Sequence, residues 1–235
     1  MTKQDIILKS PLGNILDRSF EEDYKGSFFA VLARAGVGKT AFLVQLALNA
    51  MVRERNVLHV SLSDPVKKVT LRYSELFDNL IEQSPEENIS ELWQSMLPYR
   101  FIMTFRKTSF SVPKFKERLT DLTEQDIFMP DFIIVDGLDF DETIREKLIA
   151  LKELAKKGSF HVWFSVNTHR DEEKDGKGMP LSFSHVEDLF NTVLKLKPEG
   201  TAAHIETLKG MEEHFEKTTV VLDASSMLIR AGSDG

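Results

Sequence analysis

Two glycines, a lysine and a threonine stand together in the run Gly36-Val37-Gly38-Lys39-Thr40. Glycines let the backbone turn tightly and bring its N–H groups close to phosphate oxygens, and the N-terminus of a following helix also favours negative charge. In such a run the lysine reaches the β- and γ-phosphates and the threonine hydroxyl ligates Mg²⁺. The apolar residues before and after it predict a strand leading in and a helix leading out. The pattern therefore predicts a phosphate-binding loop.

The predicted loop departs from the usual pattern at one position. In G-x-x-x-x-G-K-[ST] the first glycine is replaced here by Ala33. An ordinary strand, turn and helix with a chance Gly-Lys-Thr is the competing interpretation. The residues expected to contact a nucleotide are Arg34, Ala35, Gly36, Val37, Gly38, Lys39, Thr40 and Ala41.

Polar residues also end three apolar runs that read as buried strands. Asp136 follows residues 132–135, Ser63 and Asp64 follow residues 57–62, and Asn167 follows residues 160–166. A carboxylate at a strand's carboxyl end is placed where a magnesium ligand is needed. The competing interpretations are structural: Asp136 caps a turn, Asp64 caps the helix that opens at Pro65, and Asn167 simply begins a loop.

The composition limits the classes of protein that this chain can belong to. Its 235 residues are 42% hydrophobic, which suffices for the core of one large α/β domain. With 30 Lys and Arg against 37 Asp and Glu, the net charge of −7 gives no global attraction for nucleic acid or an anionic membrane. The chain has no cysteine, and no stretch of it suggests a membrane-spanning helix, so we expect a cytoplasmic protein without membrane association.

Helical and strand patterns alternate through most of the chain. Early alternation predicts a parallel sheet with right-handed crossovers, and three late strands with short connections predict an antiparallel addition. We expect a helix with caps at both ends, running from Asp139 to Gly158, and a mobile polar loop over residues 171–184. The other helices are expected over residues 41–55, 65–80, 84–97 and 113–123, and the late strands over residues 192–196, 204–208 and 218–222.

The segments 35–40, 57–64, 133–136 and 185–196 together resemble the RecA-like P-loop ATPases, most closely the KaiC-like branch. The resemblance implies a three-layer α/β fold with a mostly parallel sheet of about eight strands and an antiparallel C-terminal addition. It covers a nucleotide-binding domain at residues 26–223, preceded by a lead-in at 1–25 and followed by a C-terminal tail at 224–235. It also implies that the Asp136 strand lies between the strands ending at Asp64 and Asn167.

The resemblance assigns roles to several residues. Asp136 would hold Mg²⁺ through its water shell, and Asn167 would sense the γ-phosphate. Related proteins orient the attacking water with paired glutamates, where this chain has Ser63 and Asp64, so Asp64 is the remaining candidate for that catalytic role. Lys209 lies near the position of a basic finger that reaches a neighbouring subunit, but a solvated lysine is the favoured alternative.

The leading hypothesis is a protein that binds ATP and Mg²⁺ and acts as a nucleotide-dependent switch, with slow hydrolysis. The alternative is a regulatory or scaffold module that binds nucleotide without hydrolysing it, and either could work as a homo-oligomer or with a protein partner. A DNA recombination or repair ATPase is disfavoured, because Arg170, Lys174 and Lys177 face four acidic residues in the 168–180 loop and no aromatic residue is available to stack on a base. Two further residues, His59 and His161, are expected in the core.

Overall fold

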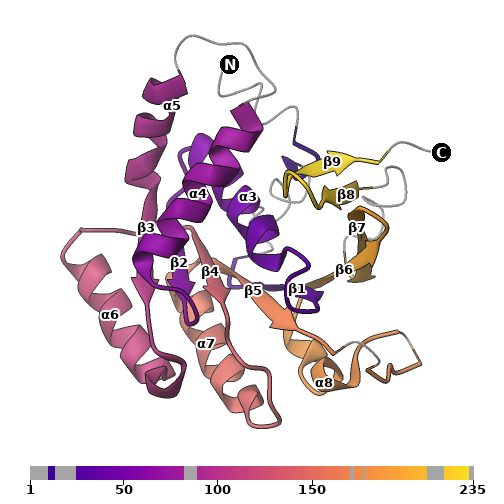
Figure 1. The fold of residues 1–235 in the computed structure, drawn as a ribbon. Helices are drawn as coiled ribbons and strands as arrows, with labels where there is room; N and C mark the ends of the chain where they lie inside the picture. Colours follow the sequence, from indigo (N-terminus) through magenta and orange to yellow (C-terminus); the bar gives the residue numbers. More distant parts are fainter. Residues whose placement is uncertain are drawn as a thin grey trace.

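The computed structural model describes residues 10–13, 25–81, 89–169, 172–176, 178–210 and 220–232. Most of the lead-in at 1–25 and the start of the helix expected at 84–97 lie outside these residues. The described chain forms an α/β structure with one nine-stranded sheet between two helical layers (Figure 1).

The sheet is mostly parallel, with an antiparallel C-terminal part. Its strand order is β3-β2-β4-β5-β1-β6-β7-β8-β9, in which neighbours from β3 to β6 run parallel and those from β6 to β9 run antiparallel. The order places β4 between β2 and β5, as expected, and β1 beyond β5. The strands are β1 (Phe28–Ala33), β2 (Val57–Ser61), β3 (Arg100–Thr104), β4 (Phe132–Asp136), β5 (His161–Asn167), β6 (Thr192–Glu199), β7 (Ala202–Lys209), β8 (Val220–Asp223) and β9 (Ile229–Ala231).

Helices cover both faces of the sheet and enclose two cores (Figure 1). Strand β1 contributes to both, since Phe29 and Val31 point into one core whereas Phe28 and Ala30 point into the other. Burial on both faces is what a central parallel strand requires. The first layer contains α3 (Lys39–Val52), α4 (Val66–Ile81) and α5 (Ile89–Met96), and the second contains α6 (Val112–Glu124), α7 (Ile144–Gly158) and α8 (Leu181–Ser184).

Short 3-10 turns complete the described elements. They are η2 (Leu97–Tyr99), η3 (Lys107–Ser109) and η4 (Glu187–Leu189).

Both predicted caps of helix α7 were wrong. The helix begins at Ile144, and Asp139 instead pairs with Lys107 at 2.6 Å. At the other end Gly158 is still helical, and Ser159 ends the helix with a left-handed φ of 55°. The ring of Phe160 packs over Gly158, where an added β-carbon would lie 2.4 Å from it. Close packing, rather than a left-handed turn, accounts for this glycine.

The C-terminal segment was also misassigned, because the sheet extends beyond residue 223. Strand β9 pairs with β8 and forms the edge of the sheet inside the range assigned to the tail. The turn between the two strands is held by Asp223, whose Oδ1 accepts hydrogen bonds from the backbone N–H groups of Ser225 and Ser226 at 3.0 and 2.8 Å. Residues 220–231 therefore form a hairpin, called here the C-terminal hairpin.

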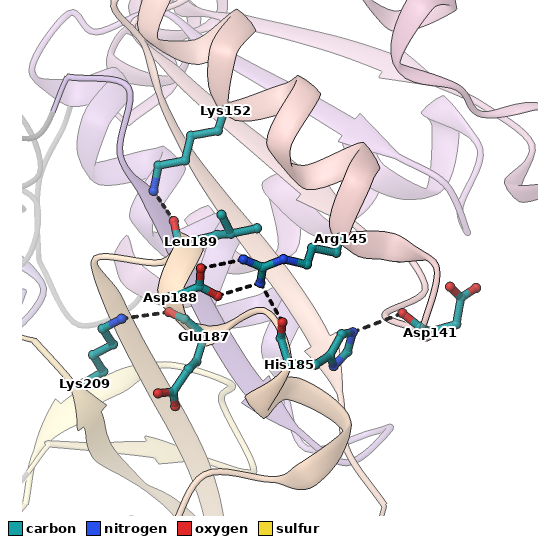
Figure 2. Close-up of polar contacts among 8 residues, drawn as sticks. All are labelled: Asp141, Arg145, Lys152, His185, Glu187, Asp188, Leu189 and Lys209. Carbon is teal, nitrogen blue, oxygen red and sulfur yellow. Dashed lines mark hydrogen bonds and ion pairs between the residues drawn. The ribbon is translucent and has the colours of Figure 1, made fainter.

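The connection between β5 and β6, expected to include a mobile polar loop, contains short elements of secondary structure in its described residues. It contains α8 and η4, and an isolated bridge joins Lys174 to Pro180. Basic side chains from two elements hold its last part (Figure 2). Arg145 of α7 makes a bidentate contact with Asp188, with both distances 2.7 Å.

Two lysines also bind the backbone of this connection (Figure 2). Lys152 of α7 donates to the carbonyl oxygen of Leu189, and Lys209 of β7 donates to that of Glu187 at 2.7 Å. Lys209 is therefore a part-buried residue that contacts its own chain, and the expectation of a solvated lysine was wrong.

Candidate functional site

The residues 34–38, called here the glycine loop, join the end of β1 to the start of α3. Gly36 and Gly38 take positive φ angles of 81° and 113°, which other residues rarely adopt. A β-carbon on Gly38 would also lie 2.3 Å from the Cδ2 atom of Leu222 in the C-terminal hairpin. Helix α3 begins directly at Lys39. The positive φ angle and this distant contact both favour glycine at position 38.

The side chain of Lys39 folds back over the glycine loop. Its Nζ donates to the carbonyl oxygens of Ala33 and Arg34, at 2.8 and 2.9 Å, and the residue is only 8% exposed. Burial lowers the pKa of Lys39 to about 8, although the nearby carboxylate of Asp136 acts in the opposite direction. Lys39 is thus more buried than an ordinary surface lysine.

The hydroxyl of Thr40 meets the carboxylate at the end of β4. Thr40 Oγ1 donates to Asp136 Oδ2 at 2.8 Å. The other carboxylate oxygen, Oδ1, accepts from Ser165 Oγ at 2.5 Å, and Ser165 Oγ accepts from the backbone N–H of Gly137 at 3.0 Å. Asp136 is 6% exposed. A hydroxyl and a buried carboxylate from different elements are thereby held in one orientation.

The role of Ser165 was not recognised from the sequence. The available signal was a hydroxyl residue in the middle of the apolar strand β5, at a position that is only 4% exposed. A buried hydroxyl is expected to have a hydrogen-bond partner, but the sequence does not say which residue provides it.

Oxygen ligands suitable for a magnesium ion are present at this point. Mg²⁺ is commonly held by one or two protein oxygens and keeps several of its waters. Thr40 Oγ1 and Asp136 Oδ2 are 2.8 Å apart, so Thr40 could ligate an ion whose water shell Asp136 would hold. These two residues fit the ion. Among the described residues there is no group of three or more His, Asp or Glu side chains that could hold a metal ion.

Asp64 follows β2, but its carboxylate is engaged by helix α4. It accepts from Lys68 Nζ at 2.8 Å and pairs with Arg72 at 3.6 Å. The neighbouring Ser63 lies beside Gly137, because a β-carbon on Gly137 would be 3.0 Å from Ser63 Oγ. The turns after β2 and β4 are therefore adjacent. The Asp64 carboxylate is held by two cations of helix α4.

Asn167 is the last residue of β5, as expected, and lies beside the start of the glycine loop. It pairs with Ala33 in the β1–β5 ladder, and the backbone N–H of Thr168 donates to the Ala33 carbonyl oxygen at 3.1 Å. Ala41, by contrast, is buried in the core below the loop and lies in the first turn of α3. Its side chain packs in the core and does not face the surface of the glycine loop.

A cavity of about 580 Å³, called here the outer cavity, adjoins the glycine loop. One wall is the loop itself, and the opposite wall is the C-terminal hairpin with the β6–β7 turn. The lining residues are Arg34, Ala35, Gly36, Val37, Thr168, His169, Pro198, Gly200, Ala202, Ala203, Leu222, Ala224 and Met227.

The C-terminal hairpin is fastened to helix α3 by one buried side chain. Gln45 Nε2 donates to the carbonyl oxygen of Met227, and Gln45 Oε1 accepts from the backbone N–H of Ile229, both at 2.8 Å. This pair of contacts fixes the wall of the outer cavity relative to the glycine loop.

The two expected core histidines are confirmed. His59 is fully buried and its Nδ1 lies 3.1 Å from the hydroxyl of Tyr73, while His161 is 3% exposed. Burial is the main reason that the pKa of His59 falls to about 4 and that of His161 to about 3. Both rings are therefore neutral near pH 7.

Comparisons with protein-family models and with curated proteins gave no match. Among the residues that the structure describes, no helix has the length and apolar character needed to cross a membrane. Conclusions about function consequently depend on the geometry of the site.

Proposed function

We propose that this chain is a RecA-like P-loop protein that binds ATP with Mg²⁺ and acts as a nucleotide-dependent switch. The observation that carries the proposal is the convergence of Lys39, Thr40 and Asp136, with Thr40 Oγ1 and Asp136 Oδ2 only 2.8 Å apart. A lysine, a hydroxyl and a strand-end carboxylate are the groups that nucleotide-binding loops use for phosphate and Mg²⁺.

The strand order supports this proposal. Strand β4, with Asp136 at its carboxyl end, lies between β2 and β5, and β1 follows β5. Ligands of open α/β sheets bind outside the carboxyl ends of the strands. The glycine loop, Ser63 and Asn167 are all at this edge, next to the ends of β1, β2 and β5.

Each residue of the proposed site would have a separate task. Lys39 would exchange its two carbonyl contacts for phosphate oxygens, and the loop N–H groups would bind the same phosphates. Thr40 would ligate Mg²⁺, with Asp136 holding the ion's water shell and Ser165 orienting Asp136. The bound ion would neutralise phosphate charge. The base would enter the outer cavity against the apolar wall of the C-terminal hairpin.

The contacts of Asp64 favour a second candidate, a module that binds nucleotide without hydrolysing it. A carboxylate must be free to accept a hydrogen bond if it is to orient an attacking water. Asp64 is already paired with Lys68 and Arg72. If ATP is bound but not turned over, the switch would depend on exchange of nucleotide rather than on hydrolysis.

Titration of the purified chain with ATP, ADP and GTP, with and without Mg²⁺, tests the proposal. We expect saturable binding of ATP that strengthens with Mg²⁺, and Asp136→Asn should lose the Mg²⁺-dependent part because it removes the charge that favours the ion. If none of the three nucleotides binds saturably, the proposal is refuted. A phosphate-release assay on the same samples then separates slow hydrolysis from its absence.

A further inference from the structure

A second cavity, of about 310 Å³, opens at the carboxyl edge of β1, β5 and β6 and is called here the basic cavity. It is built from four separate parts of the chain. Its lining residues are Arg34, Thr168, His169, Glu172, Lys174, Pro180, Lys195, Leu196, Lys197 and Pro198.

The charges in this cavity do not cancel. Lys197 pairs with Glu206 at 3.2 Å, so these two residues largely neutralise one another. The other charged lining residues are Arg34, Lys174 and Lys195 against Glu172, three positive charges and one negative, which leaves two positive charges. This excess occurs in a chain whose net charge is −7. It is therefore a local feature, opposite in sign to the molecule as a whole.

The one carboxylate in the wall is used to hold the loop. Glu172 accepts hydrogen bonds from the backbone N–H groups of His169 at 3.1 Å and Ser182 at 2.8 Å. Burial raises the pKa of Glu172, but these hydrogen bonds outweigh it and the net pKa is lowered. Asp175 accepts similarly from the N–H of Met179 at 2.9 Å. These two carboxylates therefore have structural partners in the loop, and Glu172 remains a single negative charge near Lys195.

Two lysines share the cavity. Lys195 lies on β6 next to β1, paired with Leu32, and Lys174 comes from the β5–β6 connection at its bridge with Pro180. Partial burial, followed by the nearby Lys174 ammonium, lowers the pKa of Lys195. Bringing two ammonium groups together costs free energy that an anion between them would offset.

We propose that the basic cavity binds the phosphate group of a small phosphorylated molecule, at a site that adjoins the proposed nucleotide site but does not include Lys39 or Thr40. A phosphate monoester carries close to two negative charges near pH 7, which matches the uncompensated charge of the cavity. Arg34 and the lysines supply charge-assisted hydrogen bonds. The lining contains, among the described residues, no Phe, Tyr or Trp side chain that could stack on a nucleic-acid base, so a small ligand fits better than single-stranded nucleic acid.

The two cavities adjoin, because Arg34, Thr168, His169 and Pro198 line both. A phosphorylated ligand in the basic cavity would thus lie beside the glycine loop and contact the same arginine. Binding in the basic cavity does not require the glycine loop to bind nucleotide, and each site can fail independently of the other.

The test uses Lys39→Ala protein, in which the glycine loop is impaired, and glycerol 3-phosphate as the probe. Isothermal titration calorimetry at low salt should give saturable binding of glycerol 3-phosphate and none of glycerol. Adding Lys174→Gln and Lys195→Gln should weaken the affinity for glycerol 3-phosphate about tenfold or more, because two charge-assisted contacts are lost. Lys157→Gln, on the distant end of α7, is the matched control and should have no effect.

Three results would overturn the proposal. They are no saturable binding of the probe, equal affinity in the Lys174→Gln/Lys195→Gln protein, and a single-stranded oligonucleotide that displaces the probe and binds the cavity more tightly than the probe does. Lys195→Arg preserves the charge and should retain affinity within a few-fold. Circular dichroism of each variant verifies that it is folded, since Lys174 is exposed and Lys195 only partly buried.

Discussion

The glycine loop and the basic cavity share Arg34 but are built in opposite ways. The loop is one continuous segment whose shape depends on backbone angles and on the contact between Gly38 and Leu222. The cavity is assembled from four segments, and its character depends on side-chain charge. Substitutions in the loop should therefore destabilise the fold through strain and lost packing, whereas substitutions in the cavity should weaken binding and leave the fold intact.

The largest effect is expected from Gly38→Val. The substitution imposes a φ of 113° on a branched residue and places its β-carbon 2.3 Å from Leu222 Cδ2. Backbone strain and overpacking together should cost about 2–4 kcal/mol in free energy of unfolding. Urea denaturation measures this. Gly36→Ala is the control, since nothing lies within 4 Å of its added β-carbon, and it should cost about 1 kcal/mol from φ alone.

Equal stability of Gly38→Val and Gly36→Ala would show that the C-terminal hairpin does not press on the loop. Only the positive φ angle, and not packing against Leu222, would then explain the glycine at position 38.

Gln45→Ala should have the next largest effect. It removes both contacts that fasten the hairpin and leaves the Met227 carbonyl and the Ile229 N–H unpaired, which should lower the free energy of unfolding by about 2–3 kcal/mol. Asn79→Ala is the control, because Asn79 donates a single hydrogen bond to Ser226 in the same turn. Its cost should be about 1 kcal/mol. A Gln45 variant as stable as the Asn79 variant would contradict the role given to Gln45.

The proposed nucleotide affinity should decline above neutral pH. The pKa of Lys39 is lowered to about 8 in the free protein, so a growing fraction of Lys39 is neutral as pH rises past 8 and its attraction for phosphate is lost. Between pH 7 and pH 9 the dissociation constant should increase about tenfold, equivalent to about 1.4 kcal/mol.

The control for the pH experiment is Lys39→Arg, whose guanidinium stays charged over this range. Whatever its affinity at pH 7, that affinity should change little by pH 9. A wild-type affinity that is flat between pH 7 and pH 9 would mean that Lys39 does not titrate in this window or does not bind phosphate.

The smallest effect is expected from Asp64→Asn. Its partners Lys68 and Arg72 are solvent-exposed, with side chains 55% and 38% exposed, so losing these ion pairs should cost less than about 1 kcal/mol. Phosphate release, if any is measured, should be unchanged because the carboxylate is already paired. Loss of turnover with nucleotide affinity intact would instead make Asp64 the group that orients the water.

Sequence patterns were sufficient where neighbouring residues determine the structure. Strand β4 was predicted at residues 132–136 and has those bounds, and the turn before Lys39 followed from its glycines. Long, apolar, periodic segments carry their own signal. The strand order followed from the family resemblance and is confirmed, whereas the RecA-like assignment and the nucleotide site stay predictions.

The features that the sequence did not provide depend on distant partners. The partner of Asp136, Ser165, is 29 residues away, and Leu222 reaches Gly38 from the C-terminal hairpin. The charges of the 168–180 loop alone do not indicate the basic cavity, because Lys195 enters the cavity lining from β6. Arg170 and Lys177, two cations of that count, lie outside the described residues.

The proposed nucleotide site is tested by the affinity of Lys39→Ala for Mg·ATP, measured by calorimetry beside wild type and Lys157→Ala. We expect a loss of about a hundredfold or more in Lys39→Ala, because the cation nearest the proposed phosphates is removed, and no change in Lys157→Ala. If Lys39→Ala protein is folded and binds Mg·ATP as tightly as wild type, the glycine loop is not the nucleotide site.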